Sequence, residues 1–245
     1  MFNQYFEELQ KLLNRVEKDE GNRIKNAAQA IASSIQQDGI VHVFGCGHSH
    51  MLGEELFYRA GGLAPISPIL IEDLMLHKGA VRSSQLEKAE QLAEDFMADI
   101  RIQPEDVVIV ASTSGRNPVP IDVAEIAKKQ GAYVIAITSP RYAKSQSSRH
   151  KTGKYLYESC DLTIDNHIEV GDSLMQHESL DESFGSGSTV IGAAIVNAVM
   201  AEAVNVMIEQ QFDPPIFKSG NVDGGGEHNR KLIDKYKSRI PMLER

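Results

Sequence analysis

Two short loops in the sequence combine hydroxyl side chains with glycine, a composition suited to binding an anion. The first loop is Gly45–His50 (GCGHSH), and the second is Ser112–Asn117 (STSGRN). Each follows an apolar run, at residues 40–44 and 107–111, and each precedes a segment with a helical pattern. Because the first turn of a helix has unpaired N–H groups and a partial positive charge, a phosphate group is stabilised there. Two such loops predict a ligand that is phosphorylated and polyhydroxylated.

The small and polar residues of these loops are the candidates for binding that ligand. Hydroxyl and amide side chains donate hydrogen bonds to phosphate oxygens, and glycine leaves backbone N–H groups accessible. An alternative is that the serines only cap the helices that follow. Arg116 either pairs with the phosphate or remains solvated. The predicted binding residues are Gly47, His48, Ser49, Ser112, Thr113, Ser114, Gly115 and Asn117.

A dinucleotide is the other ligand that the first loop allows. The loop begins like the G-x-G-x-x-G pattern, but His50 stands where the third glycine permits close helix–strand packing. Glu72 or Asp73 follows at about the distance expected of a ribose-binding acid. The sequence therefore leaves a nucleotide open as the less favoured ligand.

The two loops together resemble those of the SIS (sugar isomerase) domain family, whose second loop has the form S-x-S-G-x-T/N/S and binds the phosphate of a phosphosugar. The resemblance covers roughly residues 31–214. Within the family, STSG resembles the phosphoheptose isomerases, and residues 86–95 with the later GSGST resemble N-acetylmuramic acid 6-phosphate etherases. It implies a sugar-phosphate isomerase, or a lyase or etherase, that abstracts a proton next to a carbonyl. A non-catalytic phosphosugar sensor is the alternative.

The resemblance does not extend to the general base. Family members use a glutamate ten residues beyond the loop serine, and this chain has Arg59 there. Glu54 and Glu55 lie one helical turn earlier, and Glu55 is the predicted base, although a solvated helix face would look the same. In the etherases a later helix supplies a second acid, for which Glu90 and Glu94 are candidates.

Two histidines outside the loops are further candidates for proton transfer. His177 lies in the polar segment 165–187, whose length is typical of a functional lid. His228 follows Gly224–Gly226, which have the conformational freedom to deliver it and Glu227 into a site, including that of a neighbouring subunit. The alternatives are an exposed surface histidine and a flexible hinge.

The histidines of the first loop raise the question of a metal. His48 and His50 flank Ser49, and phosphoheptose isomerases can hold zinc through a His and a Glu one helical turn apart. Glu55 and Arg59 occupy the corresponding positions here. Since a zinc site needs three or four converging ligands, we predict no metal and no cofactor. His48 or His50 would then contact the sugar or act as an acid.

The elements that position these residues follow from the hydrophobic pattern. Short apolar runs alternate with helical segments, which predicts parallel strands joined by βαβ crossovers. The acidic patch at residues 19–22 is expected to break the N-terminal helix. The expected strands are 40–44, 69–71, 107–111, 133–138 and 162–164, and the expected helices are 2–16, 24–35, 51–60, 87–99, 120–129 and 190–210.

These elements predict an α/β fold: a three-layer α/β/α sandwich around a doubly wound parallel sheet of about five strands, with an N-terminal helical extension. We expect the extension at residues 1–36, the SIS domain at 31–214, and a C-terminal tail with a helix at 215–245. The apolar helices at the N-terminus and at 190–210 offer more surface than one domain needs. They predict a homodimer or homotetramer.

Composition narrows the class of protein. Of the 245 residues, 42% are hydrophobic and 24% charged, as in soluble globular proteins. The net charge of -9 disfavours nucleic acid as a partner. No uninterrupted apolar run spans a bilayer, the N-terminus lacks the pattern of a signal peptide, and two cysteines suit a reducing compartment. We predict a cytoplasmic protein whose partner is a phosphorylated sugar, neither a nucleic acid nor a membrane.

Overall fold

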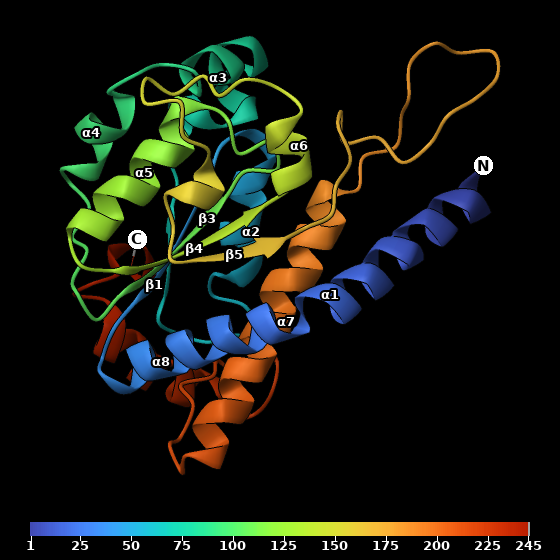
Figure 1. The fold of residues 1–245 in the computed structure, drawn as a ribbon. Helices are drawn as coiled ribbons and strands as arrows, with labels where there is room; N and C mark the ends of the chain where they lie inside the picture. The colour runs from blue at the N-terminus through green and yellow to red at the C-terminus, as the bar shows by residue number, and fades with distance from the viewer. Residues whose placement is uncertain (245) are drawn as a thin grey trace.

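A five-stranded parallel sheet lies at the centre of the molecule (Figure 1). The computed structural model describes residues 1–244. The strands lie in the order β2-β1-β3-β4-β5, so the order reverses between β1 and β3. This arrangement confirms the predicted doubly wound α/β fold. The strands are β1 (Val41–Gly45), β2 (Ile66–Ile69), β3 (Val107–Ala111), β4 (Tyr133–Thr138) and β5 (Leu162–Asp165).

Helices cover both faces of the sheet. One face packs against α1, α2 and α7, and the other packs against α4 and α5. The α-helices are α1 (Phe2–Gln36), α2 (Met51–Leu56), α3 (Ala80–Leu86), α4 (Leu92–Met97), α5 (Pro118–Lys129), α6 (Pro140–Lys144), α7 (Ser188–Glu209) and α8 (Gly225–Tyr236). The 3₁₀ turns are η1 (Gly47–His50), η2 (Glu72–Leu74), η3 (Leu76–Lys78), η4 (Leu156–Glu158) and η5 (Pro241–Leu243).

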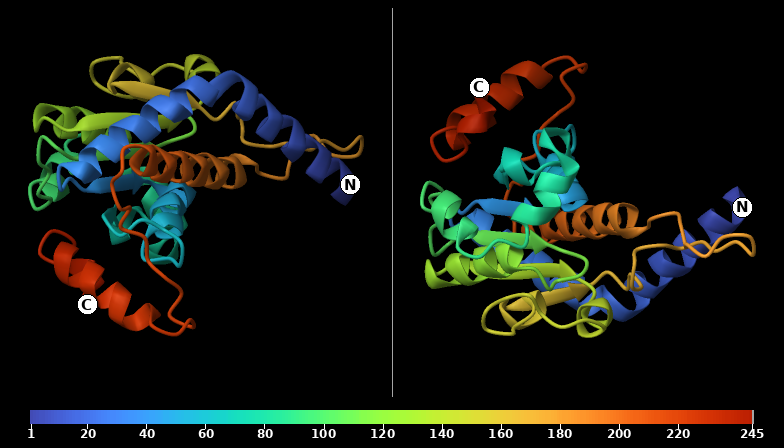
Figure 2. Two further views of the ribbon diagram at one scale, coloured as in Figure 1. Left: turned by 90° about the horizontal axis from the view of Figure 1, so that it is seen from below. Right: turned by 90° about the horizontal axis from the view of Figure 1, so that it is seen from above.

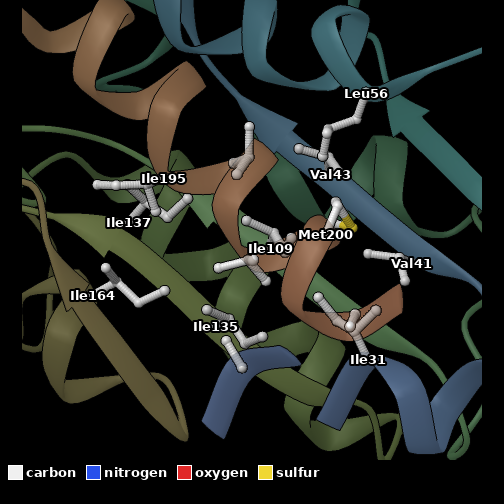
Figure 3. Packing of buried hydrophobic residues seen from close by; sticks show 14 of the residues in the cluster. Ile31, Val41, Val43, Leu56, Ile109, Ile135, Ile137, Ile164, Ile195 and Met200 are labelled. Atoms are coloured by element: carbon white, nitrogen blue, oxygen red, sulfur yellow. The ribbon is translucent and has the colours of Figure 1, made fainter. Parts of the chain in front are cut away.

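The near-continuous apolar strands reflect burial on both faces. Successive side chains of a strand point to opposite faces, so Val43 packs toward α7 while its neighbour Phe44 packs toward α4. Figure 3 shows part of the first of these two cores, in which aliphatic side chains of the strands meet those of the covering helices. Both faces of β1 and β3 are therefore fixed by packing, which also fixes the position of the loops that follow them.

The N-terminal helix is continuous, so the predicted break at residues 19–22 is wrong. Glu20 is buried against the sheet instead of facing water. Its carboxylate accepts hydrogen bonds from Arg23 Nη1, at 2.9 and 3.0 Å, and from Asp165 N at 3.1 Å. Gly21 keeps a helical conformation, with no atom within 4 Å of where a Cβ would lie. The tertiary contacts of Glu20 stabilise a helix that the local sequence alone would interrupt.

Three other predicted boundaries are also wrong. The second strand is Ile66–Ile69 rather than 69–71, because these residues pair with Val41–Phe44. Of the helix expected at 87–99, the structure forms α4 (Leu92–Met97), which begins after Gln91 with φ +67°. The helix expected at 51–60 ends at Leu56, where Phe57 becomes extended.

The apolar helix α7 packs against α1 and the sheet. Among the described residues, α7 is the one helix that is long and apolar enough to cross a membrane by length and composition. The sequence analysis expected no segment of this kind. However, 44% of its most apolar window is buried inside the molecule. One such helix is weak evidence for a membrane span, because a core helix of a soluble protein meets the same criterion.

The C-terminal segment folds back onto the molecule. After α7 an extended segment leads to α8, which lies at the periphery (Figure 2). Leu63 and Ile216 form an antiparallel bridge, and Tyr236 and Ile240 pack against Ile40. The glycines expected to form a flexible hinge are instead the start of α8, with Gly224 at the N-cap in a left-handed conformation.

Candidate functional site

A small polar cavity lies where the two hydroxyl loops meet. It opens at the carboxyl ends of β1 and β3, between η1 and the start of α7. In doubly wound sheets, ligands bind at this edge, where the strand order reverses. The polar part of its lining consists of His48, Ser49, Ser112, Thr113, Asn166, Ser188 and Thr189. The structure thus brings four predicted binding residues into one cavity and adds three that the sequence did not single out.

Glycines give the loops the conformation that this meeting requires. Gly47 and Gly115 have φ of +55° and +56°, which L side chains rarely adopt. A Cβ at Gly115 would lie 2.5 Å from Thr138 Oγ1. A Cβ at Gly45 would lie 2.5 Å from the backbone of Ser49. Both loops therefore approach their neighbours too closely to accommodate side chains at these positions.

The loop hydroxyls divide into bonded and free groups. Ser112 Oγ accepts a hydrogen bond from Gly115 N at 3.3 Å, and Thr113 Oγ1 accepts one from Asn166 Nδ2 at 3.2 Å. The Ser49 and Ser114 hydroxyls make no side-chain hydrogen bond within residues 1–244. Neither η1 nor α5 has a side-chain cap from its N-cap residue, so these serines are not helix caps. Ser49 lines the cavity and is available to a ligand, whereas Ser114 lies outside the cavity lining.

The other predicted loop residues lie beside the cavity or close the loop. Asn117 is buried, and its Oδ1 accepts a hydrogen bond from Arg149 Nη1 at 2.9 Å. Arg116 turns away and donates to Ser147 O at 3.0 Å. His50 Nδ1 is bonded to Gly47 O within the first loop. These contacts hold the shape of the loops.

Glu87 is a carboxyl group between the two loops that sequence analysis did not single out. It directly follows α3 and is half-buried. Burial raises the pKa of Glu87, while a hydrogen bond from Asn117 and the charges of Lys88 and Arg149 lower it, and the net direction is upward. Its charge in turn adds to the rise that burial causes in the pKa of the Cys46 thiol. Glu87 is therefore close to both loops, through Cys46 of the first and Asn117 of the second.

The acids that the sequence proposed for this region are placed differently. Glu90 and Glu94 are exposed. No local sequence pattern distinguishes Glu87, because its neighbours Cys46 and Asn117 are distant in the chain.

Glu55, the predicted base, is engaged outside the cavity lining. Its Oε1 forms an ion pair with Arg59 and accepts a hydrogen bond from Asn197 Nδ2 of α7 at 2.8 Å. Arg59, which stands where family members have a glutamate, thus neutralises the nearest available acid on α2. The role predicted for Glu55 stays a prediction.

The two candidate histidines lie away from the cavity. His177 is exposed in the long loop between β5 and α7, which projects beside the N-terminus of α1 (Figures 1 and 2). Its Nδ1 accepts a hydrogen bond from Ser179 N at 3.1 Å. His228 Nε2 is bonded to Ile216 O at 2.8 Å. Neither lines the cavity within the described chain, and their proposed catalytic roles stay predictions.

One residue of the long loop does reach the cavity edge. Asp172 Oδ1 accepts hydrogen bonds from Gly187 N at 3.1 Å and Ser188 N at 2.9 Å, and its Oδ2 accepts one from Ser188 Oγ at 2.6 Å. The carboxylate satisfies the unpaired N–H groups at the start of α7. It thereby fixes Ser188 and Thr189 at the cavity wall.

Metal binding has no support from clustered ligands. Within residues 1–244, no group of three or more His, Cys, Asp or Glu side chains is placed to hold a metal ion. The two histidines of the first loop belong to no such group. His50 is bonded to its own loop, and His48 is exposed at the cavity.

The fold and this site define a class: an α/β protein with two hydroxyl- and glycine-rich loops at the switch point of a parallel sheet, as in sugar isomerase domains. A family model described as "SIS domain" matches residues 4–139. The chain belongs to the SIS domain family, and to the UPF0309 proteins within it. A UPF0309 protein of Geobacillus kaustophilus is 56% identical over 243 residues, which cover 99% of this chain and 97% of that protein.

Solved structures share the fold at low sequence identity. A phosphoheptose isomerase from Francisella tularensis has a TM-score of 0.52 and 17% identity, covering 82% of this chain and 95% of that one. The sugar isomerase domain of an RpiR transcription factor from Sphaerobacter thermophilus has a TM-score of 0.52 and 16% identity, covering 97% and 98%. Both likenesses concern the architecture.

Proposed function

We propose that this protein binds a phosphorylated sugar at the Gly45–His50 and Ser112–Asn117 loops, with the sugar phosphate over the cavity of about 20 Å³ between them. The observation that carries the proposal is the meeting of these loops at the switch point, where the hydroxyl of the lining residue Ser49 is unpartnered within residues 1–244. Hydroxyl and backbone N–H donors suit the phosphate oxygens, and Asn166 and Thr189 suit sugar hydroxyls. The structurally similar protein from Francisella tularensis is a phosphoheptose isomerase, which supports the same ligand class.

We further propose that the protein is an aldose–ketose isomerase in which Glu87 transfers the proton. A general base must have a pKa near the working pH, and the burial that raises the pKa of Glu87 moves it in that direction. The carboxylate would take a proton from the hydroxyl-bearing carbon beside the carbonyl and return it to the former carbonyl carbon, while the hydroxyl proton moves to the carbonyl oxygen through an enediol. A lyase would start with the same proton abstraction and then expel a leaving group.

A non-catalytic phosphosugar sensor is the second candidate. It is favoured by the Arg59–Glu55 pair, because the position that carries the family glutamate is cationic here and its neighbour is neutralised. The fold is also found in the sugar isomerase domain of a transcription factor. The two functions differ in whether bound sugar exchanges its protons with water.

The apolar surface supports the proposed homo-oligomer. Val190 and Ile208 of α7 are 44% and 59% exposed, and Phe2 and Phe6 of α1 are 74% and 66% exposed. Large apolar side chains gathered on two helices favour burial against another subunit. We propose a cytoplasmic homodimer or homotetramer. Light scattering tests the assembly, and a monomeric mass contradicts it.

Binding and chemistry are tested in sequence. Thermal shift with fructose 6-phosphate, sedoheptulose 7-phosphate and N-acetylmuramic acid 6-phosphate should show stabilisation of about 2.7 kcal/mol at one hundred times the dissociation constant. The unphosphorylated sugars serve as controls. Proton NMR of a stabilising sugar in heavy water then reports loss of the signal beside the carbonyl. Exchange supports the isomerase, binding without exchange supports the sensor, and stabilisation by none of the phosphosugars contradicts the proposed ligand class.

A further inference from the structure

The segment of residues 169–187, between β5 and α7, is attached at both ends to walls of the cavity between the two loops. Asn166 lies just before the segment, and Ser188 and Thr189 follow it directly. All three residues line the cavity. Figure 1 shows the segment projecting from the molecule beside the N-terminus of α1. The conformation of this segment therefore affects the surroundings of the proposed phosphosugar site.

The cavity is nearly closed in this structure. Its volume is about 20 Å³, and a single water needs about 10–15 Å³. A phosphate group that reaches the lining hydroxyls therefore requires one wall to move. The walls from β1 and β3 are fixed by packing on both faces of the sheet. The first turn of α7, where Ser188 and Thr189 are half-buried, is not part of the sheet and is the wall that can move.

Asp172 holds this wall through three hydrogen bonds. Two come from the backbone N–H groups of Gly187 and Ser188, and the shortest joins Ser188 Oγ to Asp172 Oδ2 at 2.6 Å. Ser188 therefore donates its hydroxyl proton to a carboxylate of the same chain, so this lining hydroxyl is not free to donate to a ligand. Leu174 packs against the same place, since a Cβ at Gly187 would lie 2.9 Å from Leu174 Cδ1.

The charge of the segment opposes a phosphosugar beside it. The five acidic residues of the segment, which contains no lysine or arginine, are Glu169, Asp172, Glu178, Asp181 and Glu182. A segment that closed over a bound phosphate would present lysine or arginine to it. A phosphate monoester carries about two negative charges at pH 7, so it is repelled by the Asp172 carboxylate and competes with it for Ser188 Oγ.

The remaining contacts allow the segment to move outward. Arg141 Nη1 donates to Glu169 Oε1 at 2.6 Å, and Tyr5 Oη donates to Ser186 O at 2.8 Å, both in exposed positions. Asp172 has φ +52°, in the left-handed region that residues with a side chain rarely adopt. Its bonds to the start of α7 thus hold a backbone conformation that the segment does not otherwise favour.

We propose that the contact of Asp172 with Ser188 is autoinhibitory. In this structure the carboxylate occupies the Ser188 hydroxyl and keeps the first turn of α7 close to the two loops. Phosphosugar binding displaces Asp172, moves residues 169–187 outward and frees Ser188 for the ligand. This inference rests on the proposed function, because it concerns the regulation of the same site. The alternative is a helix cap that stabilises α7 without competing with the ligand.

Calorimetric titration with fructose 6-phosphate, sedoheptulose 7-phosphate and N-acetylmuramic acid 6-phosphate tests the competition. Asp172→Asn keeps an oxygen for the backbone N–H groups but loses the charge, so it should bind the phosphosugar at least about fivefold more tightly than the wild type. The matched control is Asp181→Asn, which removes an exposed carboxylate of the same segment and should bind within about twofold of the wild type. Unchanged or weaker binding by Asp172→Asn, or an equal gain in Asp181→Asn, overturns the autoinhibitory contact.

Hydrogen exchange of the wild-type chain tests the displacement without a substitution. Backbone amides of residues 169–187 should exchange at least about threefold faster with saturating phosphosugar, while those of β1 and β3 stay unchanged. Unchanged or slower exchange of the segment overturns the autoinhibitory contact and leaves the proposed ligand class standing. Binding to neither the wild type nor Asp172→Asn contradicts the proposed function and this inference with it. Binding to Asp172→Asn alone supports both.

Discussion

At the scale of single residues, the cavity is defined by groups that the protein leaves free. Ser112 and Thr113 are used to hold the second loop, whereas Ser49 and Ser114 have no side-chain partner within residues 1–244. Glycines at the tight positions allow each loop to pack closely against its neighbours. Glu87, which contacts Asn117 and lies outside the cavity lining, is the acid–base group that we propose.

The free hydroxyls lead to a prediction about affinity. Ser49→Ala should weaken binding of the stabilising phosphosugar by about tenfold, since a hydrogen bond to a charged group contributes roughly 1.5–3 kcal/mol. Ser114→Ala should have a similar effect. Isothermal titration calorimetry measures it, and Ser84→Ala, at an exposed serine of α3, should leave affinity unchanged. Equal affinity in all three variants would mean that the loops do not bind the phosphate.

Glu87 leads to a prediction about rate. Glu87→Gln should lower kcat at least about a hundredfold with binding changed by less than about threefold, because the amide keeps the shape and loses the proton transfer. Since its pKa is raised, the wild-type rate should fall with decreasing pH at a value above that of an ordinary glutamate. Isomerisation rates from pH 4 to 8 check this. A wild-type rate in Glu87→Gln would assign the proton transfer elsewhere, and Glu55→Gln, His177→Ala and His228→Ala then test the other candidates.

At the scale of elements, α1 is a helix kept continuous by tertiary contacts. Glu20 joins Arg23 and the backbone of Asp165 at the end of β5, so the centre of α1 is fixed to the strand that precedes Asn166 of the cavity. Asp172 fixes the start of α7 in a similar way. The elements around the cavity are thus held by carboxylates bonded to backbone N–H groups.

The centre of α1 leads to a prediction about stability. Gly21→Ala should increase the free energy of unfolding by about 0.5–1 kcal/mol, because Gly21 is helical and a Cβ would meet no atom within 4 Å. Urea denaturation followed by circular dichroism measures it. Gly45→Ala is the contrasting variant and should destabilise the protein, since its Cβ would lie 2.5 Å from the Ser49 backbone. A destabilised Gly21→Ala would indicate that α1 is not a straight helix at this point.

At the scale of the whole molecule, Asp106 connects the sheet to the C-terminal segment. It accepts hydrogen bonds from the backbone of Ile40 and Gln103 and from Arg239, which lies beyond α8. The last thirty residues therefore pack on the sheet through a buried ion pair as well as through apolar contacts. Breaking one partner of such a pair leaves an uncompensated buried charge.

This connection leads to a prediction about pH. The pKa of Asp106 is lowered from 3.8 to about 2 in the folded protein, so the unfolded chain binds more protons between these values. Its contribution of about 2 kcal/mol is present above pH 4 and is lost as the pH falls through 2. Asp106→Asn should lower the unfolding free energy at pH 7 and reduce its change between pH 4 and 2. Asp181→Asn, at an exposed loop position, should retain the wild-type pH dependence. An unaltered pH dependence in Asp106→Asn would show that this ion pair does not govern acid stability.

The sequence by itself determined the parts that depend on contiguous residues. The strands at 107–111 and 133–138 could be predicted because each is an apolar run with turn residues at its ends. Both hydroxyl loops could be predicted because their glycines and serines are adjacent in the chain, and the parallel topology places the ends of such strands at one edge.

Only the tertiary structure decided the parts that join distant segments. The register of β2 depends on its pairing with β1, and the continuity of α1 depends on the contact of Glu20 with Asp165. Glu87 is a candidate for proton transfer because it lies near Cys46 and Asn117. These residues are 41 positions before it and 30 positions after it in the sequence. The physical reason is that burial and long-range hydrogen bonds set the conformation and pKa of such groups. The sequence around such a group does not show which distant residues will bury it or form hydrogen bonds with it.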